Sequence, residues 1–203
     1  MYYLPRILTI LGIFTVVGGA TPQVLGLPAP TIMVQVDADT LFEQGNDKIR
    51  AEDYEGAVEA FTQVLKMNPQ DAEAYYNRGL ALAQLEEYEK AIADYSKVLE
   101  LNPDDLEAYD NRALARARLQ DYLGAIADYT QVLERKPDDA EAYYNRGLSH
   151  AQLEGSEQDA IKDLEKAAEL FAKAGQTTES EEALSIVEKL QQYKNNVAPH
   201  DQN

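Results

Sequence analysis

The sequence predicts an all-α protein built from stacked pairs of helices. Three observations support this fold class: a segment that recurs at a fixed spacing, apolar residues at helical spacing within each copy, and a proline that closes most copies. The segment EAYYNRGL occupies residues 73–80 and again 141–148, and EAYDNRAL stands between them at 107–114. This spacing of 34 residues is typical of repeat proteins, in which each unit buries its apolar face against the next.

Aligned on that period, the chain contains four units, at residues 38–71, 72–105, 106–139 and 140–174. The second and third units agree at 21 of 34 positions, whereas the first is more diverged. We therefore expect a repeat array over residues 39–175.

Each unit predicts two antiparallel helices of about 14 residues. In the unit 72–105, apolar or small residues recur three or four positions apart over 75–85 and again over 91–99. Pro103 ends the second helix, because proline cannot continue a helix and disfavours helical geometry in the residue before it. The carboxylate of Asp105 is placed to cap the next helix.

Small residues explain how the two helices of a unit pair. Gly79 and Ala91 let the two backbones approach closely, and Tyr95 fills the space beside them. The same places hold Gly45/Ala57/Phe61, Ala113/Ala125/Tyr129 and Gly147/Ala160/Leu164. In the fourth unit the second helix is shifted by one residue relative to the other units. We expect the turn at 154–157, which contains a glycine, to accommodate the inserted residue.

This pattern resembles the tetratricopeptide repeat (TPR), a 34-residue helix-turn-helix with a large residue at position 4, Gly or Ala at 8, Ala at 20, an aromatic at 24 and Pro at 32. The resemblance implies a right-handed superhelical solenoid of about four repeats plus a C-terminal capping helix. The chain departs from the family in having no Trp and no closing Pro in its fourth repeat. The matching positions are Leu41, Gly45, Ala57, Phe61, Pro69, Tyr75, Gly79, Ala91, Tyr95, Pro103, Tyr109, Ala113, Ala125, Tyr129, Pro137, Tyr143, Gly147 and Ala160.

The N-terminal residues 1–38 differ from the repeats. Arg6 precedes the apolar run 7–17, and small residues that suit cleavage end at Ala20 and at Ala38. These features predict a secretory signal peptide or, if it is not cleaved, an N-terminal membrane anchor. We therefore expect an exported TPR protein of bacterial type, located in the periplasm or another extracytoplasmic compartment and, if the segment is not cleaved, attached to a membrane through its N-terminus.

The C-terminal segment 176–194 is predicted to be a capping helix, because a stacked array must cover its last apolar face. The run 178–181, Thr-Glu-Ser-Glu, fits a capping box that starts a helix at 179. Ala183, Ile186, Val187 and Leu190 then form one apolar stripe. Residues 195–203 are expected to form a flexible tail.

Composition argues against several classes of function. The chain carries 18 Lys and Arg against 36 Asp and Glu, a net charge of −18, and this charge disfavours nucleic acid as a partner. It has no cysteine and only two histidines, His150 and His200. We find no phosphate-binding glycine loop and no nucleophile–base pair. We therefore expect no catalytic residues, no metal site and no cofactor.

Charged residues recur at two repeat positions. Arg78, Arg112 and Arg146 share position 7, and Asp94, Asp128 and Asp163 share position 23. Pairing within each repeat uses all three arginines, whereas pairing across repeats leaves the first arginine and the last aspartate alone. An internal tie between paired helices is the favoured interpretation, and a ligand-binding ladder of arginines is the alternative.

The TPR resemblance places the first helices on a concave face that binds partners. It implies a protein or peptide ligand contacted by Asn46, Arg50, Tyr76, Asn77, Gln84, Asp110, Asn111, Arg118, Tyr144, Asn145 and Gln152. The row Asn77, Asn111 and Asn145 has two interpretations, since an amide can bind an extended backbone or brace the neighbouring helix.

Two functions follow as hypotheses. One is a non-catalytic scaffold or adaptor that holds a partner segment in the groove outside the cytoplasm, and the other is a self-associating structural protein of the envelope or membrane. TPR proteins that bind the acidic tails of cytosolic chaperones use cationic residues at three of five clamp places. Counted from the first repeat, those places hold Phe42, Asn46, Asn77, Glu107 and Asn111, and from the second, Tyr76, Leu80, Asn111, Glu141 and Asn145. Because no cation remains, we expect no binding of acidic chaperone tails.

Overall fold

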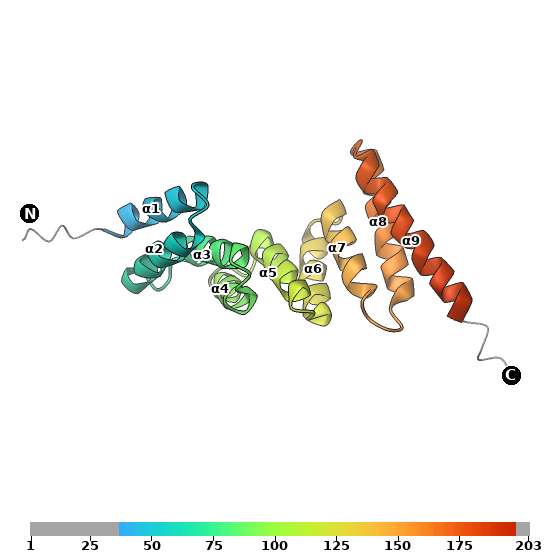
Figure 1. Ribbon diagram of the computed structural model, residues 1–203, viewed down its shortest axis with the longest axis horizontal. Coiled ribbons are helices and arrows are strands. Elements are labelled where there is room, and N and C mark those ends of the chain that lie inside the picture. The colour runs from blue at the N-terminus through green and yellow to red at the C-terminus, as the bar shows by residue number, and fades with distance from the viewer. Residues whose placement is uncertain (1–36, 198–203) are drawn as a thin grey trace, which may run out of the picture. The chain divides into compact units, whose positions relative to one another are not determined.

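The computed structural model describes residues 37–197, so nearly all of the predicted signal or anchor segment, and the end of the predicted tail, lie outside it. The described residues form nine α-helices (Figure 1). No helix in this range is both long and apolar enough to cross a bilayer. The bounds are α1 Ala38–Arg50, α2 Tyr54–Met67, α3 Ala72–Gln84, α4 Tyr88–Leu101, α5 Leu106–Arg118, α6 Tyr122–Arg135, α7 Ala140–His150, α8 Glu157–Lys173 and α9 Thr177–Val197.

Consecutive helices pack as helix-turn-helix pairs. Each helix contacts the one before and the one after it in the chain, with the largest contacts inside the pairs and between α8 and α9 (Figure 1). The first helices also touch one another, α1 with α3, α3 with α5 and α5 with α7. The first helices therefore share one face, and the predicted all-α arrangement of stacked pairs is confirmed.

Local signals set the helix ends. Asp105 accepts a hydrogen bond from the backbone N–H of Ala108 at 2.9 Å, which confirms the predicted cap. The same cap is made by Asp37, Asp53, Asp71, Asp121 and Asp139. Residues before the closing prolines leave the helical region, as Asn102 does with φ −135° and ψ 89°. Such caps each stabilise a helix by about 1 kcal/mol.

The predicted close packing inside each pair is also confirmed. A Cβ atom on Gly79 would lie 2.8 Å from Cε1 of Tyr95, so only a very small residue fits there without displacing the ring. Phe61, Tyr95 and Tyr129 are almost completely buried. These aromatic rings form the centre of the core between paired helices.

The turn inside each pair uses a left-handed residue. Glu52, Glu86 and Gln120 adopt φ of 58°, 60° and 63° in the first three repeats. In the fourth repeat Gly155 takes this conformation with φ 82°. The inserted residue is thus accommodated at a glycine, which adopts positive φ without strain.

The C-terminal helix begins earlier than expected, and the capping-box prediction is wrong. Helix α9 starts at Thr177, so Thr178 lies inside its first turn and is not the N-cap residue. The physical reason is a tight turn: Gly175 has φ 79°, and the N–H of Gln176 donates to Phe171 O at 2.9 Å. The next helix therefore follows directly. It also extends through Val197, beyond the predicted end at 194.

The apolar stripe of α9 packs as predicted. Ala183 and Val187 are buried, and Ile186 and Leu190 pack against a cluster that contains Ile161 and Leu164 of α8. The hydroxyl of Ser180 is buried and donates to Ala168 O at 2.9 Å. Helix α9 thus covers the apolar face of the last repeat.

Candidate functional site

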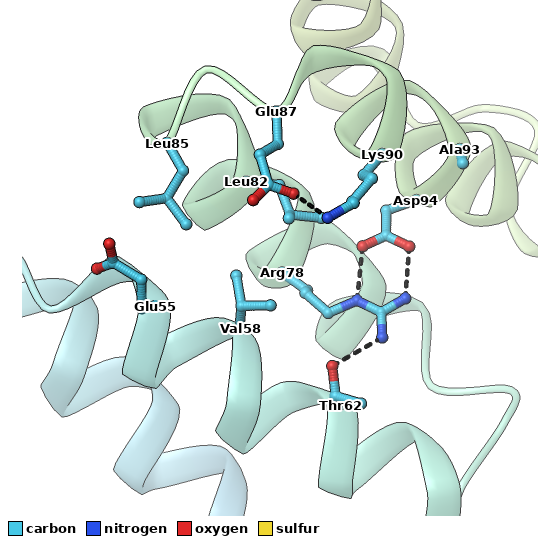
Figure 2. A pocket seen from close by; sticks show the side chains of 10 residues that line it. All are labelled: Glu55, Val58, Thr62, Arg78, Leu82, Leu85, Glu87, Lys90, Ala93 and Asp94. Atoms are coloured by element: carbon cyan, nitrogen blue, oxygen red, sulfur yellow. Dashed lines mark hydrogen bonds and ion pairs between the residues drawn. The ribbon is translucent and has the colours of Figure 1, made fainter.

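Arginine–aspartate ties join the two helices of a repeat. Nε and Nη2 of Arg78 each donate to a carboxylate oxygen of Asp94 at 2.7 Å (Figure 2). Nη1 of the same guanidinium donates to Oγ1 of Thr62, in the preceding repeat, at 3.0 Å. The hydrogen bonds to Asp94 raise the pKa of Arg78 further above its ordinary value. One guanidinium therefore links three helices.

The same arrangement recurs in the next two repeats. Arg112 pairs with Asp128 and Arg146 with Asp163, at distances of 2.7–2.9 Å. Each guanidinium also binds a hydroxyl of the preceding repeat and lies over a tyrosine ring of its own helix, the partners being Ser96, Thr130, Tyr109 and Tyr143. The internal tie is confirmed over the ligand-binding ladder. The hydroxyl partners were not predicted, although their shared repeat position is visible in the sequence.

A cavity of about 450 Å³ lies beside the first of these ties (Figure 2). It is bordered by α2, α3 and α4, with the Arg78–Asp94 pair and the Glu87–Lys90 ion pair among its lining residues. None of the predicted groove residues lines it. In the next repeat Arg116 replaces Leu82, and its Nη1 donates to Asp128 at 2.7 Å.

The predicted groove residues lie on the first helices or in the turns that follow them, and several bind one another. Nδ2 of Asn77 donates to Oδ1 of Asn46 at 3.3 Å. Nδ2 of Asn111 donates to the hydroxyl of Tyr76 at 3.0 Å and to Glu107 O at 2.9 Å. The bonds from Asn77 to Asn46 and from Asn111 to Tyr76 join successive repeats and fit the bracing interpretation of the asparagine row.

Other predicted groove residues are placed differently. Arg50 pairs with Asp47 on its own helix. The hydroxyl of Tyr144 donates to Glu182 of α9 at 2.8 Å, so the capping helix holds this side chain. Gln84 is exposed, and Asp110 is half-buried. Contact of these side chains with a partner stays a prediction.

Three predicted residues, Arg118, Asn145 and Gln152, come together around a second cavity. This cavity has a volume of about 460 Å³ and lies between α5, α6 and α7. Its other lining residues are Leu114, Ala117, Tyr122, Tyr129, Leu148 and Ser149. Leu114 is 44% exposed, so its apolar surface is accessible beside the cavity. The amide of Asn145, unlike those of Asn77 and Asn111, makes no hydrogen bond within residues 37–197.

Asp110 is the most perturbed carboxylate of this face. Its pKa is raised to about 6, first by burial and then by the nearby carboxylates of Asp139, Glu141 and Glu107, against the opposing effect of Lys136. Its repeat position holds an aromatic residue elsewhere: Phe42, Tyr76 and Tyr144. The sequence shows this exception, but its burial depends on the packing of α5 against α7.

Metal-ligating side chains do not gather in the described part of the chain. Between residues 37 and 197, no three His, Asp or Glu side chains are placed to hold a metal ion. Nδ1 of His150 is buried there and has no hydrogen-bond partner. His150 ends α7 and lies on none of the cavities described above.

Family models match two parts of this array. The model described as "Tetratricopeptide repeat" matches residues 42–105, and the model described as "TPR repeat" matches residues 116–154. The chain contains tetratricopeptide repeats. A comparison with curated proteins gives no match.

Solved TPR structures are similar to this chain. MamA residues 41-end from Desulfovibrio magneticus RS-1 has a TM-score of 0.62 and 22% identity over 77% of this chain and 96% of that one. The first TPR of Spaghetti (RPAP3), bound to the HSP90 peptide SRMEEVD, has a TM-score of 0.55 and 29% identity over 59% of this chain and 97% of that one. The Arabidopsis OM64 TPR domain has a TM-score of 0.54 and 26% identity over 57% and 96%. At this level, the similarity to MamA shows the TPR fold alone.

Proposed function

We propose that this TPR protein is a non-catalytic scaffold that binds an extended partner segment along the face formed by α1, α3, α5 and α7. The observation that carries the proposal is the cavity between α5, α6 and α7, where an exposed leucine, Leu114, adjoins the unbraced amide of Asn145. Apolar surface with a few convergent polar groups is the usual chemistry of a recognition site. The peptide-bound RPAP3 structure supports the proposal by showing a similar TPR domain holding a peptide.

The partner is neutral or basic on this proposal. Glu107 stands at a place where the clamp for acidic tails carries a lysine, and its carboxylate is exposed. Asn77 and Asn111 keep the clamp amides, but these amides already bind Asn46 and Tyr76. An acidic tail would meet like charge and gain no charge-assisted hydrogen bond.

Two labelled peptides test this preference: SRMEEVD and a control in which both glutamates are lysines. We expect the full chain to bind the lysine peptide at least several-fold tighter in a fluorescence anisotropy titration, because the net charge of −18 attracts cations. Tighter binding of the acidic peptide would overturn the preference. Binding of neither peptide, nor of any peptide in a neutral or basic library, would overturn the scaffold proposal.

The packing of α9 favours the scaffold over the self-association hypothesis. Self-association through the C-terminal end would need an uncovered apolar face on the last repeat, whereas Ala183 and Val187 of α9 are buried there. Sedimentation velocity separates the two hypotheses: we expect a monomer at micromolar concentration, and a stable oligomer would favour self-association.

We also propose that the repeats act outside the cytoplasm, either released by cleavage or held by an uncleaved N-terminal segment. The support is Arg6 followed by the apolar run 7–17, a pattern typical of export signals. Cell fractionation with mass spectrometry of the N-terminus tests this location. Full-length protein in the cytosolic fraction would contradict it.

A further inference from the structure

Asp110 interrupts an aromatic pattern at the centre of the shared face. In the first two repeats the residue at this place packs against the buried aromatic ring of the second helix. Phe42 meets Phe61 edge-on at 5.4 Å and Tyr76 meets Tyr95 at a tilt at 6.0 Å, both measured between ring centroids. In the third repeat the corresponding ring is Tyr129, and Asp110 offers it no aromatic partner. No aromatic pair within residues 37–197 includes Tyr129.

Tyr129 provides a second and independent observation. Its side chain is only 1% exposed and borders the cavity of about 460 Å³ beside Leu114 and Leu148. No residue between 37 and 197 makes a hydrogen bond to its hydroxyl. Burial raises the pKa of this phenol, so the hydroxyl stays protonated and can donate. Unlike the hydroxyl of Tyr95, which is buried without a partner, the hydroxyl of Tyr129 keeps some solvent access, so it is free to donate to a ligand in the cavity.

The charges around Asp110 favour a cation at that end of the site. Asp139 and Glu141 face it from the start of α7, Glu107 from its own helix, and the phenols of Tyr76 and Tyr129 from the neighbouring helices. The nearby cation is Lys136, whose Nζ lies 3.8 Å from Glu107. At the other end of the site stands the exposed Arg118, which makes no ion pair in the described range. A cationic partner group is therefore favoured beside Asp110 and disfavoured beside Arg118.

The spacing of these features matches an extended chain. Asp110 and Leu114 are four residues apart on α5, which corresponds to about 6 Å along the helix axis. In an extended peptide, side chains two positions apart point the same way and lie about 6.6 Å apart. Where the segment runs parallel to α5 as it passes over that helix, a basic residue at Asp110 and an apolar residue in the cavity can thus belong to one strand with a single residue between them.

We propose that this face binds an extended partner segment in which a Lys or Arg pairs with Asp110 and an apolar side chain two positions away fills the cavity beside Leu114, Leu148 and Tyr129. This inference rests on the proposed scaffold function and names the chemistry of its partner. The hydroxyl of Tyr129 and the amide of Asn145 are then available to hydrogen-bond the backbone of the segment.

Three labelled peptides test the spacing, with one Lys and one Leu separated by zero, one or two residues in the same Ser/Thr background. We expect the full chain at pH 7.5 to bind the peptide with one intervening residue about tenfold tighter than either of the others. A fourth peptide, with norleucine in place of Lys, keeps the apolar stem and removes the charge. Equal affinity for all three spacings would overturn the inference and leave the scaffold proposal standing. No binding of any peptide would overturn both.

Matched variants test the residues. Asp110→Asn should weaken binding of the Lys-x-Leu peptide about tenfold and leave the norleucine peptide unchanged, because it removes only the charge. Asp138→Asn is the control, since it removes the same charge at an exposed position just before α7. Tyr129→Phe should weaken both peptides several-fold. Equal affinities for wild type and Asp110→Asn, with both proteins folded by circular dichroism, would overturn the assignment of Asp110.

Discussion

The three arginine–aspartate ties differ in how many cations hold the carboxylate. Asp128 receives two hydrogen bonds from Arg112 and a third from Arg116 at 2.7 Å. Within residues 37–197, Asp94 is bonded by Arg78 alone. Both carboxylates are buried, so the loss of one arginine leaves Asp94 without a counter-charge but leaves Asp128 with one.

This difference predicts unequal costs for the same substitution. Arg78→Met should lower the free energy of unfolding by about 2–4 kcal/mol, because it leaves a buried carboxylate unpaired. Arg112→Met should cost about 1–2 kcal/mol, because Arg116 still neutralises Asp128. Urea denaturation followed by circular dichroism measures both. Equal midpoints for the two variants would show that the third bond does not compensate.

Asp110 is expected to destabilise the fold at neutral pH. Its pKa is raised to about 6 by burial in the folded state, against about 3.9 in the unfolded chain. The folded state therefore prefers the protonated acid, and stability is lost as the pH rises from about 4 through 6. A carboxylate that lowers stability on the proposed binding face is consistent with a functional residue.

Asp110→Asn should therefore stabilise the protein by about 1–2 kcal/mol at pH 8, after allowance for solvent screening. The advantage should shrink by about half at pH 5, where the folded wild type is mostly protonated and the unfolded chain is mostly ionised. Urea midpoints of the variant and wild type across this range measure the effect. A constant difference between pH 8 and 5 would contradict the assigned pKa.

At the scale of one element, α9 determines how the array ends. Two adjacent residues of α9 differ sharply in environment: Ala183 is completely buried against α8, whereas Leu184 is 45% exposed. Tyr144 and Ser180 add hydrogen bonds that tie α9 to α7 and α8. The helix therefore acts as part of the folded core and not as an appended tail.

Ala183→Asp should detach this helix, lowering the melting temperature by several degrees and promoting aggregation, because it buries an unpaired charge. Leu184→Asp is the matched control and should change the melting temperature little. Deletion of residues 176–203 should reproduce the effect of Ala183→Asp. A truncated protein that stays monomeric with an unchanged melting curve would show that α9 is not a cap.

At the scale of the whole molecule, the net charge of −18 sets how partners approach. Acidic residues also concentrate at the starts of the first helices, which are capped by aspartates and carry a glutamate or aspartate in the first turn. The resulting field attracts cationic segments over distances comparable to the Debye length, about 10 Å at 0.1 M salt.

Binding of a basic segment should therefore depend on ionic strength. We expect the dissociation constant of the Lys-x-Leu peptide to rise about tenfold between 50 and 500 mM NaCl, since screening weakens exposed charge pairs. The norleucine peptide should change by less than twofold. If the dissociation constant of the basic peptide does not change with salt concentration, the charges do not steer this partner.

Much of the fold could be predicted from the sequence because its determinants are local and periodic. The fold repeats every 34 residues. Within each repeat, or at its edge, aspartates cap the helices and small residues pack opposite Phe61, Tyr95 and Tyr129. Hydrophobic periodicity and capping depend on residues three to five apart, so they are visible in the sequence itself. The pairing of the arginine at repeat position 7 with the aspartate at position 23 could be predicted by comparing the charges of whole repeats.

The candidate site depended on tertiary structure. Asn77 and Asn111 brace neighbouring repeats through bonds to Asn46 and Tyr76, which are 31 and 35 positions away in the sequence. The amide of Asn145 makes no such bond within residues 37–197, and the sequence alone does not show this difference. Tertiary structure also determines the cavity beside Tyr129, the burial of Asp110 and the hydrogen bond from Tyr144 to Glu182 of α9. Repeat sequences specify how each helix pair packs, whereas the reach and burial of individual side chains are decided only when neighbouring repeats stack.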